Sequence, residues 1–312
     1  MKEAVSKRGW KLLVIVLLVG FVGLGTQAFR TTDEAGKKAF DSETPLSKVL
    51  AALGEEPRLH TLDRLDSALV RKGEELVKQG YTTKPNGKQT DRISKFYECT
   101  DCHNVEQENP DMSNLDPEKR LSYAVEQNLP FNQATTLFGV VNRESWYNGD
   151  YVKKYGDKVV RARDSLTNAI QLCATECAQG RALTDWEMKA MLNYLWSIQI
   201  KLENLDLSEG MMTKLNRKRK QDEPAKATIQ QLKDEYYTAS PATFVDAQAV
   251  PERAMGKGGD PEVGKAIYKH SCRTCHRAGG PTHYRLDYSV LTFNQLQRHF
   301  DDYKKKSIYQ VL

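Results

Sequence analysis

The 312-residue sequence has few cysteines, only a small excess of positive charge and no more than one long apolar run. Six cysteines are too few for a scaffold held together mainly by disulfides. A net charge of +5, from 46 lysine and arginine residues against 41 aspartate and glutamate residues, is too dilute to indicate a nucleic-acid partner. A mean hydropathy of −0.62 excludes a polytopic membrane protein. With 39% hydrophobic and 28% charged residues, the composition is that of a globular protein, and the chain is long enough for two domains.

The one long apolar run, at residues 12–25, follows a basic amino terminus with four lysine or arginine residues and one acidic residue. A basic flank before an apolar run is typical of an export signal, and the positive-inside rule keeps the flank in the cytoplasm. Residues 10–29 are just long enough to span a bilayer, whereas Thr26-Gln27-Ala28 would suit cleavage of a signal peptide. We expect residues 1–29 to anchor the chain on the periplasmic side of the bacterial inner membrane, with a cleaved, soluble periplasmic protein as the alternative.

Apolar residues at helical spacing dominate the rest of the chain, and no stretch has the alternation typical of a strand, which predicts an all-α fold. The basic run 214–220 is expected to be solvated surface, with a docking patch for an acidic partner as the alternative. Composition predicts a tether at 30–65, a first helical domain at 66–202, a charged linker at 203–259 with one helix near 226–237, and a second helical domain at 260–312.

The pattern Cys-x-x-Cys-His occurs twice, as Cys99-Thr100-Asp101-Cys102-His103 and as Cys272-Arg273-Thr274-Cys275-His276. Two thiols three residues apart can form thioethers with the two vinyl groups on one edge of a porphyrin, and the adjacent histidine can then bind the iron. With six cysteines and six histidines in the chain, even one chance match is rare. We therefore predict two covalently bound haem c groups, held by Cys99, Cys102, His103, Cys272, Cys275 and His276.

Other uses of a Cys-x-x-Cys pair explain the pattern less well. A zinc site would have to combine two pairs about 170 residues apart, and it gives no reason for a histidine after each pair. A redox-active dithiol would follow a strand and does not need the histidine either. The predicted export agrees with haem c, because this haem is attached outside the cytoplasm.

A glycine precedes each motif within a helical pattern. Gly264 stands eight residues before Cys272, and Gly73 stands 26 residues before Cys99, with a loop around Pro85-Asn86-Gly87 in between. A glycine at such a position lets another helix cross closely. The two stretches form an internal repeat whose pattern resembles the class I cytochrome c fold. The resemblance implies two tandem domains, each with a carboxy-terminal helix.

The first domain supplies such a helix, because Thr184-Asp185-Trp186-Glu187 is a capping box that opens a helical stretch. Met188 and Met191 lie on the apolar face of this stretch together with Leu192 and Leu195. We therefore expect both methionines to be core residues and not iron ligands.

The second domain has 36 residues after His276, and none of them is a methionine. His283 and His299 are the ordinary iron ligands left, but His283 is expected on the proximal side and His299 at solvent or at a propionate. The chain stops at what resembles the start of another helix. We expect this domain to be incomplete because the sequence is truncated, with completion by a partner or a five-coordinate iron as alternatives.

The loop before the last helix of the first domain contains two cysteines but neither methionine nor histidine. Cys173, Gly180-Arg181-Ala182-Leu183 and Glu187-Met188 resemble the same loop in the dihaem thiosulfate dehydrogenases and in the haem subunit of the L-cysteine thiosulfotransferases. The resemblance implies Cys173 as an axial iron ligand and, in an enzyme, as the catalytic nucleophile toward sulfur compounds. Cys177 has no counterpart in that pattern. A Cys173–Cys177 disulfide and Cys177 as the ligand are therefore open alternatives.

Aromatic and basic residues fill 131–164, between the first motif and this loop, and we expect them to cover the haem edge. The simplest interpretation is packing against the haem and pairing with its propionates. The alternative is a cationic pocket for an anion such as thiosulfate, formed by Lys153, Lys154, Arg161, Arg163 or Arg181.

Together these features predict an exported dihaem c-type cytochrome that transfers single electrons in a periplasmic or membrane-associated redox chain. Its partners would be other cytochromes or a respiratory complex, and the membrane through the amino-terminal helix, but no nucleic acid. One alternative is an oxidoreductase acting on sulfur oxyanions, similar to a thiosulfate dehydrogenase or tetrathionate reductase, with a first haem ligated by Cys173. Another is a haem-carrying structural subunit of a respiratory complex.

Overall fold

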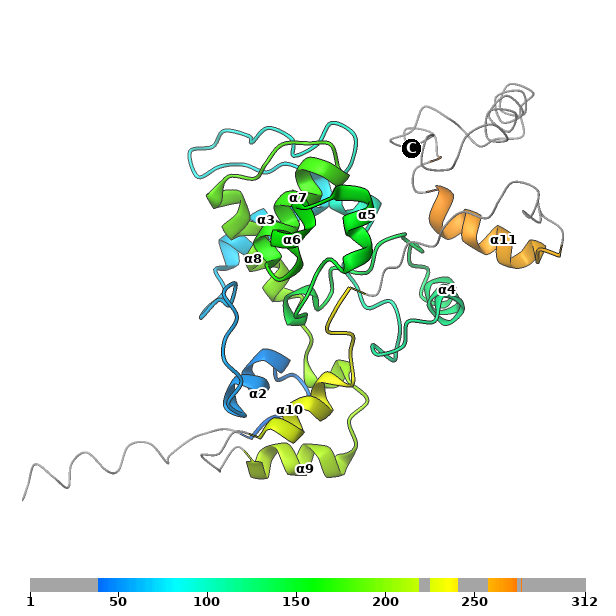
Figure 1. Cartoon of the computed structure of the whole chain (residues 1–312). Coiled ribbons are helices and arrows are strands. Elements are labelled where there is room, and N and C mark those ends of the chain that lie inside the picture. The colour runs from blue at the N-terminus through cyan, green and yellow to red at the C-terminus, as the bar shows by residue number, and fades with distance from the viewer. Residues whose placement is uncertain (1–38, 219–224, 241–257, 274–275, 277–312) are drawn as a thin grey trace, which may run out of the picture. The chain divides into compact units, whose positions relative to one another are not determined.

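The computed structural model describes residues 39–218, 225–240, 258–273 and 276. These residues form helices joined by loops, with two isolated β-bridges and no strand, so the predicted all-α class is confirmed (Figure 1). In this part of the chain, no helix has both the length and the apolar character needed to cross a membrane. The predicted anchor at 1–29 and the segment with His283 and His299 lie outside the described residues.

The helices carry the labels of Figure 1. They are α2 (Leu46–Ala52), α3 (Ser67–Gln79), α4 (Pro117–Glu126), α5 (Val152–Tyr155), α6 (Lys158–Arg163), α7 (Leu166–Leu172), α8 (Asp185–Ser197), α9 (Glu209–Lys218), α10 (Lys226–Lys233) and α11 (Pro261–Ile267). Short 3₁₀ turns lie at Cys99–Asp101, Val140–Asn142, Gly149–Tyr151 and Leu202–Asn204. Two π-helical turns, Cys173–Cys177 and Tyr268–Cys272, contain candidate site residues.

Side chains cap the amino-terminal ends of α8, in the predicted first domain, and of α11, in the predicted second domain. At α8, the Thr184 side chain accepts from the backbone N–H of Glu187, and the Glu187 carboxylate accepts from the Thr184 N–H at 2.8 Å. This confirms the predicted capping box. At α11, the Asp260 carboxylate accepts from the backbone N–H groups of Glu262 and Val263. These bonds satisfy donors that the first turn of a helix cannot pair internally.

The predicted first domain, residues 66–202, contains the crossing of α3 and α8, which make the most extensive contact between any two described helices. A Cβ atom added to Gly73 would lie only 2.1 Å from the carbonyl oxygen of Ala190 in α8. Leu76 of α3 is buried in the same core as Met188 and Met191 of α8. Two predictions are therefore confirmed: the glycine permits a close helix crossing, and the methionines are core residues.

Substituting Gly73 by alanine is expected to destabilise the fold by about 1–3 kcal/mol, because the added methyl group has to push α8 away. Gly264 holds the same place in the repeat, but an added Cβ would meet no atom of the described chain within 4 Å there. Gly264→Ala should therefore be neutral or stabilising by up to about 1 kcal/mol, through helix propensity. Urea unfolding of the two variants measures the difference, and equal destabilisation by both would contradict the α3–α8 crossing.

The predicted charged linker contains two packed helices, α9 and α10, where the sequence predicts one. Leu215 of α9 and Leu232 of α10 are completely buried. The backbone N–H of Ala225 donates to the carbonyl of Leu53, next to α2, at 3.0 Å, and Figure 1 shows α2, α9 and α10 grouped together. Apolar residues at helical spacing within the charged stretch give each helix one buried face. The basic run 214–220 is therefore not solvated throughout, because Leu215 lies within it.

The chain that follows α10 lies along the segment 140–151 of the first domain. The backbone N–H of Glu144 donates to the carbonyl of Thr238 at 2.6 Å. The Tyr236 hydroxyl donates to the carbonyl of Asn142 at 3.4 Å. These bonds fasten the end of the predicted linker to a part of the chain that leads into the candidate site.

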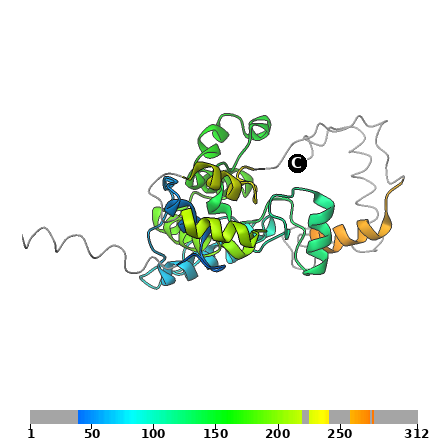
Figure 2. The ribbon, with the colours of Figure 1, turned by 90° about the horizontal axis from the view of Figure 1, so that it is seen from below.

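Of the predicted second domain, the structure describes α11 and the π-helical turn after it, which lie against α4 and its following loop (Figures 1 and 2). The carbonyl of His270 accepts from the backbone N–H of Phe131 at 2.7 Å, and His270 Nδ1 lies 2.8 Å from the carbonyl oxygen of Leu129. Val263 and Ile267 on α11 remain 46% and 37% exposed. Within the described residues, α11 thus has no partner helix of the kind that α8 provides for α3.

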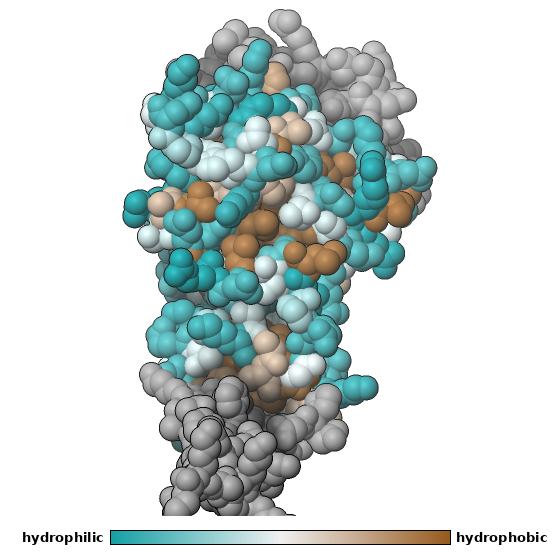
Figure 3. All heavy atoms as spheres, turned by 90° about the vertical axis from the view of Figure 1, so that its left-hand side faces the viewer, coloured by the Kyte–Doolittle hydropathy of each residue, from teal (hydrophilic) through white to brown (hydrophobic). Residues whose placement is uncertain are grey.

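The segment between α2 and α3, part of the predicted tether, is packed at His60. The imidazole is buried between the rings of Trp146 and Trp196, with centroids 5.3 and 5.9 Å away. Trp196 Nε1 also donates to the His60 carbonyl at 2.8 Å. The side chains of Leu59 and Leu65, in the same segment, are exposed. More generally, the face of the molecule shown in Figure 3 has apolar side chains in its middle, between polar regions.

His60 makes the stability of the fold depend on pH. Burial lowers its pKa below the ordinary value of 6.5, so the unfolded chain binds more protons than the folded chain between these two values. The free energy of unfolding should therefore fall as the pH falls below about 6.5, by about 1.4 kcal/mol for each unit of the pKa difference. Urea unfolding at pH 7.5 and pH 5.0 measures this loss. In His60→Gln the loss should be smaller; an unchanged loss would contradict the assignment.

Candidate functional site

The first Cys-x-x-Cys-His motif forms a tight turn. The Asp101 carboxylate accepts from the backbone N–H of Glu98 at 2.8 Å, and the His103 N–H donates to the carbonyl of Cys99 at 3.0 Å. Cys99 is half-buried and Cys102 is exposed. Burial raises the pKa of the Cys99 thiol to about 12. Both thiols and the imidazole thus lie within one turn of chain, from which they can reach a single cofactor.

His103 is oriented by a backbone carbonyl. Its Nδ1 lies 2.6 Å from the carbonyl oxygen of Thr135, so Nδ1–H donates and Nε2 keeps a free lone pair. Burial, together with the charges of Arg143 and Arg120, lowers the pKa of His103 and favours the neutral imidazole. A histidine with its other ring nitrogen bonded in this way is prepared to ligate a metal ion through Nε2.

A buried polar network fixes the loop that carries the Thr135 carbonyl. The Glu108 carboxylate accepts from the backbone N–H of Thr136 at 3.0 Å and from Arg120 at 3.1 Å. Arg143 donates to Thr135 Oγ1 at 3.0 Å and to the Thr136 carbonyl at 2.5 Å. The sequence predicts none of these three side chains as site residues, because contacts between polar residues far apart in the chain leave no periodic pattern. The only sequence feature that could have pointed to these three residues is that they lie within 40 residues after His103.

Cys173 and Cys177 lie at the two ends of the π-helical turn, where the Ala178 N–H donates to the Cys173 carbonyl at 2.9 Å. Such turns are rare and often mark functional sites. In the structure both cysteines are free thiols, joined by a hydrogen bond from Cys173 to Cys177. That bond, burial and the nearby Cys99 and Cys102 raise the pKa of Cys173. Cys173 thus lies within electrostatic range of the two thiols of the first motif.

Cys177 faces a cluster of tyrosines. Its Sγ lies 3.8 Å from the Tyr147 hydroxyl, and Tyr147, Tyr151 and Tyr155 pack against one another with centroids 4.8 and 6.4 Å apart. The hydrogen bond from Cys173 and those from the hydroxyls of Tyr155 and Tyr147 lower the pKa of Cys177 to about 6. Of the two thiols, Cys177 is therefore the one whose ionised form is favoured, and the tyrosines predicted to cover a haem edge surround it.

The structure does not bring the five predicted cations of the anion pocket together. Arg181 pairs with both oxygens of the Glu187 carboxylate, at 2.6 and 2.9 Å. Lys153 lies 3.5 Å from Asp150, and Arg161 and Arg163 are exposed on α6. Lys154 is the predicted cation that lies near the cysteine pair, where its charge helps to lower the pKa of Cys177.

The second motif begins in the π-helical turn that ends at Cys272. The backbone N–H of His276 donates to the carbonyl of Cys272 at 2.8 Å, so the chain turns here as it does in the first motif. Cys272 is half-buried, whereas Cys275 lies outside the described residues.

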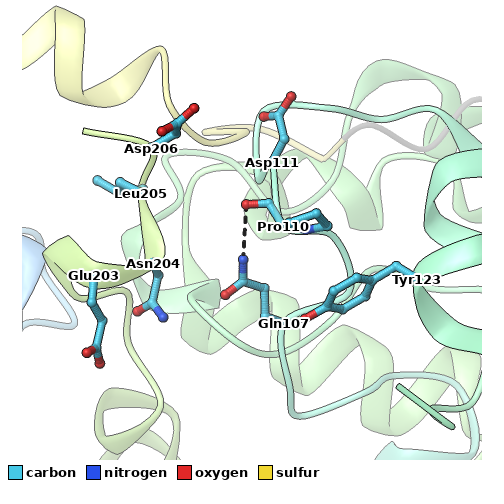
Figure 4. Close-up of a pocket in the computed structure, with 8 residues that line it drawn as sticks. All are labelled: Gln107, Pro110, Asp111, Tyr123, Glu203, Asn204, Leu205 and Asp206. Atoms are coloured by element: carbon cyan, nitrogen blue, oxygen red, sulfur yellow. Dashed lines mark hydrogen bonds between the residues drawn. The ribbon is translucent and has the colours of Figure 1, made fainter. Parts of the chain in front are cut away.

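A solvent-exposed pocket of about 480 Å³ lies away from the candidate residues. Its lining includes the carboxylates of Asp111, Glu203 and Asp206 (Figure 4). Gln107 Nε2 donates to the Pro110 carbonyl at 3.4 Å within it. The pocket contains no cysteine or histidine and is not part of the candidate site.

Comparison of the chain with protein-family models, with curated proteins and with solved structures finds no match. A function can therefore be inferred only from the residues themselves and from their geometry.

Proposed function

We propose that this chain is an exported dihaem c-type cytochrome that transfers single electrons, with class I cytochrome c-like domains at 66–202 and 260–312. The observation that carries the proposal is the arrangement at His103: two thiols on one turn precede an imidazole whose Nδ1 donates to the Thr135 carbonyl. Histidines that bind a metal ion commonly donate their other ring N–H in this way. The close crossing of α3 and α8 at Gly73 supports the class I resemblance.

The donor set of the first motif suits a covalent haem. Cys99 and Cys102 would form the thioethers, and His103 would bind the iron through Nε2. A bound haem c would supply an iron centre that accepts and releases one electron at a time. Cys173, within electrostatic range of the two thiols, would supply the iron with a second protein ligand, and a thiolate there would lower the reduction potential.

The second motif would hold the other haem through Cys272, Cys275 and His276. Its contact with α4 and the following loop supports electron exchange between the two haems within one chain. The basic flank and apolar run at 1–29 support export and anchoring on the periplasmic side of the inner membrane. The expected partners are other cytochromes or a respiratory complex.

The cysteine pair supports a second candidate, an oxidoreductase acting on sulfur oxyanions. Cys173 lies close to the first motif, and Cys177 is stabilised as a thiolate beside it. In such an enzyme two thiosulfate ions would couple to one tetrathionate and release two electrons, one for each haem. The charge of Lys154 near the pair would favour an anionic substrate.

Reductive titration of the purified full-length chain separates these functions. A carrier should take up two electrons per chain reversibly, exchange them with a partner cytochrome and not respond to thiosulfate. Reduction of the protein by thiosulfate would instead favour the enzyme. A chain without haem absorption would contradict both.

A further inference from the structure

His270 is a buried histidine that stands outside both Cys-x-x-Cys-His motifs. It lies two residues before Cys272, in the π-helical turn Tyr268–Cys272, and the residue is 6% exposed. Its Nδ1 lies 2.8 Å from the carbonyl oxygen of Leu129, and Nδ1–H is the donor because a carbonyl oxygen only accepts. Its own carbonyl accepts from the backbone N–H of Phe131 at 2.7 Å. His270 thus bonds two residues of one loop, the loop that follows α4.

The contact between this turn and the loop depends on these hydrogen bonds more than on apolar burial. On α11, Val263 and Ile267 remain 46% and 37% exposed, so their side chains contribute little to it. A buried hydrogen-bonding group that loses its partner costs more free energy than the formed bond contributes. The pair of bonds at His270 therefore favours this one register of the turn on the loop.

The same loop, residues 129–136, is also bonded to the first motif. The carbonyl of Thr135 accepts from His103 Nδ1 at 2.6 Å. The buried side chain of Asn132 donates to the carbonyl of Thr100 at 3.3 Å. The loop thus approaches His103 from its Nδ1 side, opposite the Nε2 that would bind the iron, and it contacts the turns of both motifs.

The part of the loop between these contacts is held by side chains of the first domain. Asn104 Nδ2 donates to the carbonyl of Pro130 at 2.7 Å. The Arg120 guanidinium lies over the Phe131 ring, with 4.9 Å from Cζ to the ring centroid, and is paired with Glu108 at 3.1 Å. Because the loop is fixed along its length, the position of His270 on it is also a position relative to His103.

We propose that the loop 129–136 couples the two motifs, and that His270 is the positioning residue that holds the second motif on this loop for electron exchange between the two haems. The proposal rests on the proposed function, because it requires a haem at each motif. The exchange moves one electron from a ferrous to a ferric iron and makes or breaks no covalent bond. Holding two reacting centres in one fixed arrangement speeds a reaction between them, so the exchange should be slower when this contact opens.

Three variants separate the hydrogen bond of His270 from other effects at this turn. His270→Leu removes the donor to the Leu129 carbonyl. His270→Asn keeps a donor, because the amide nitrogen of asparagine can take the place of Nδ1. Lys269→Ala changes an exposed neighbour in the same turn and serves as the control.

The test is the rate of electron equilibration between the haems after laser-triggered partial reduction of the full-length holoprotein. In His270→Leu the rate should fall by about three- to tenfold, the factor by which one hydrogen bond changes an equilibrium, with two covalent haems retained. His270→Asn should recover most of the wild-type rate, and Lys269→Ala should keep it. An unchanged rate in His270→Leu with both haems present would overturn the proposal and leave the proposed function intact; absence of haem from the wild-type chain would overturn both.

A second measurement depends neither on electron transfer nor on the folding of a variant. In the wild-type holoprotein the amide of Phe131 should exchange its hydrogen slowly, because it donates to the carbonyl of His270. Hydrogen exchange read by mass spectrometry over residues 129–136 measures this protection, which His270→Leu should reduce and Lys269→Ala should not. Exchange of the wild-type Phe131 amide at the rate of an unbonded amide would show that the contact is absent and would overturn the proposal.

Discussion

Replacing Cys99 and Cys102 together by alanine is expected to reduce the covalent haem content from two haems to one per chain. Both thioethers of the first haem depend on these thiols, which lie on one turn directly before His103. The second motif, Cys272–His276, does not share any residue with the first. The matching double variant, Cys272→Ala with Cys275→Ala, should also retain one haem. Pyridine haemochrome absorbance per mole of chain, with the protein exported by a host that matures c-type cytochromes, measures the ratio.

A substitution in α11 that should leave the fold intact provides the control for this experiment, because a loss of haem could also follow from misfolding. Gly264→Ala, which meets no described neighbour within 4 Å, should keep two haems. If either double-cysteine variant still carried two covalent haems, or if both lost all haem while remaining folded, the assignment of one haem to each motif would be wrong.

The second large effect is expected from Cys173→Ala. Cys173 lies within electrostatic range of Cys99 and Cys102, and a thiolate bound to the iron would donate charge and lower the potential. Its removal should abolish a low-spin electron paramagnetic resonance signal of small g-anisotropy and should make the first potential more positive. In the enzyme alternative, thiosulfate-dependent reduction of the protein should also be lost completely.

Cys177→Ala is the matched control, since Cys177 faces Tyr147 and Tyr155. This variant should keep the thiolate signal. Loss of the signal in Cys177→Ala but not in Cys173→Ala would make Cys177 the ligand. A wild-type spectrum of the high-spin or histidine–methionine type at the first haem would contradict cysteine ligation altogether and remove the main support for the enzyme.

Local sequence patterns predict much of the core formed by α3 and α8. The capping box at Thr184 and the glycine at the α3–α8 crossing can be identified because they depend on residues a few positions apart or on helical spacing. Met188 and Met191 follow from the same spacing, which puts them on the buried face of α8. The short distance between the two thiols of the first motif is set by a single turn, so the sequence alone suffices to predict it.

Contacts between distant segments are not predictable in this way. Arg143 meets Tyr237 94 residues later in the chain, and Glu108 accepts from Thr136 28 residues later. Individual polar residues like these have no periodicity, and their role depends on how loops fold back onto the core. For the same reason the sequence underestimates how much of the predicted linker is folded. Leu215 of α9 and Leu232 of α10 are buried by contacts with other segments of the chain, and such contacts leave no local pattern.

The mass of the intact mature chain, measured under denaturing conditions, tests the central claim most directly. A dihaem c-type cytochrome should exceed the mass of its polypeptide by two haems, and it should give a haem-staining band on a denaturing gel, because thioether bonds survive denaturation. A mass equal to that of the polypeptide alone, without a haem-staining band, would contradict the account.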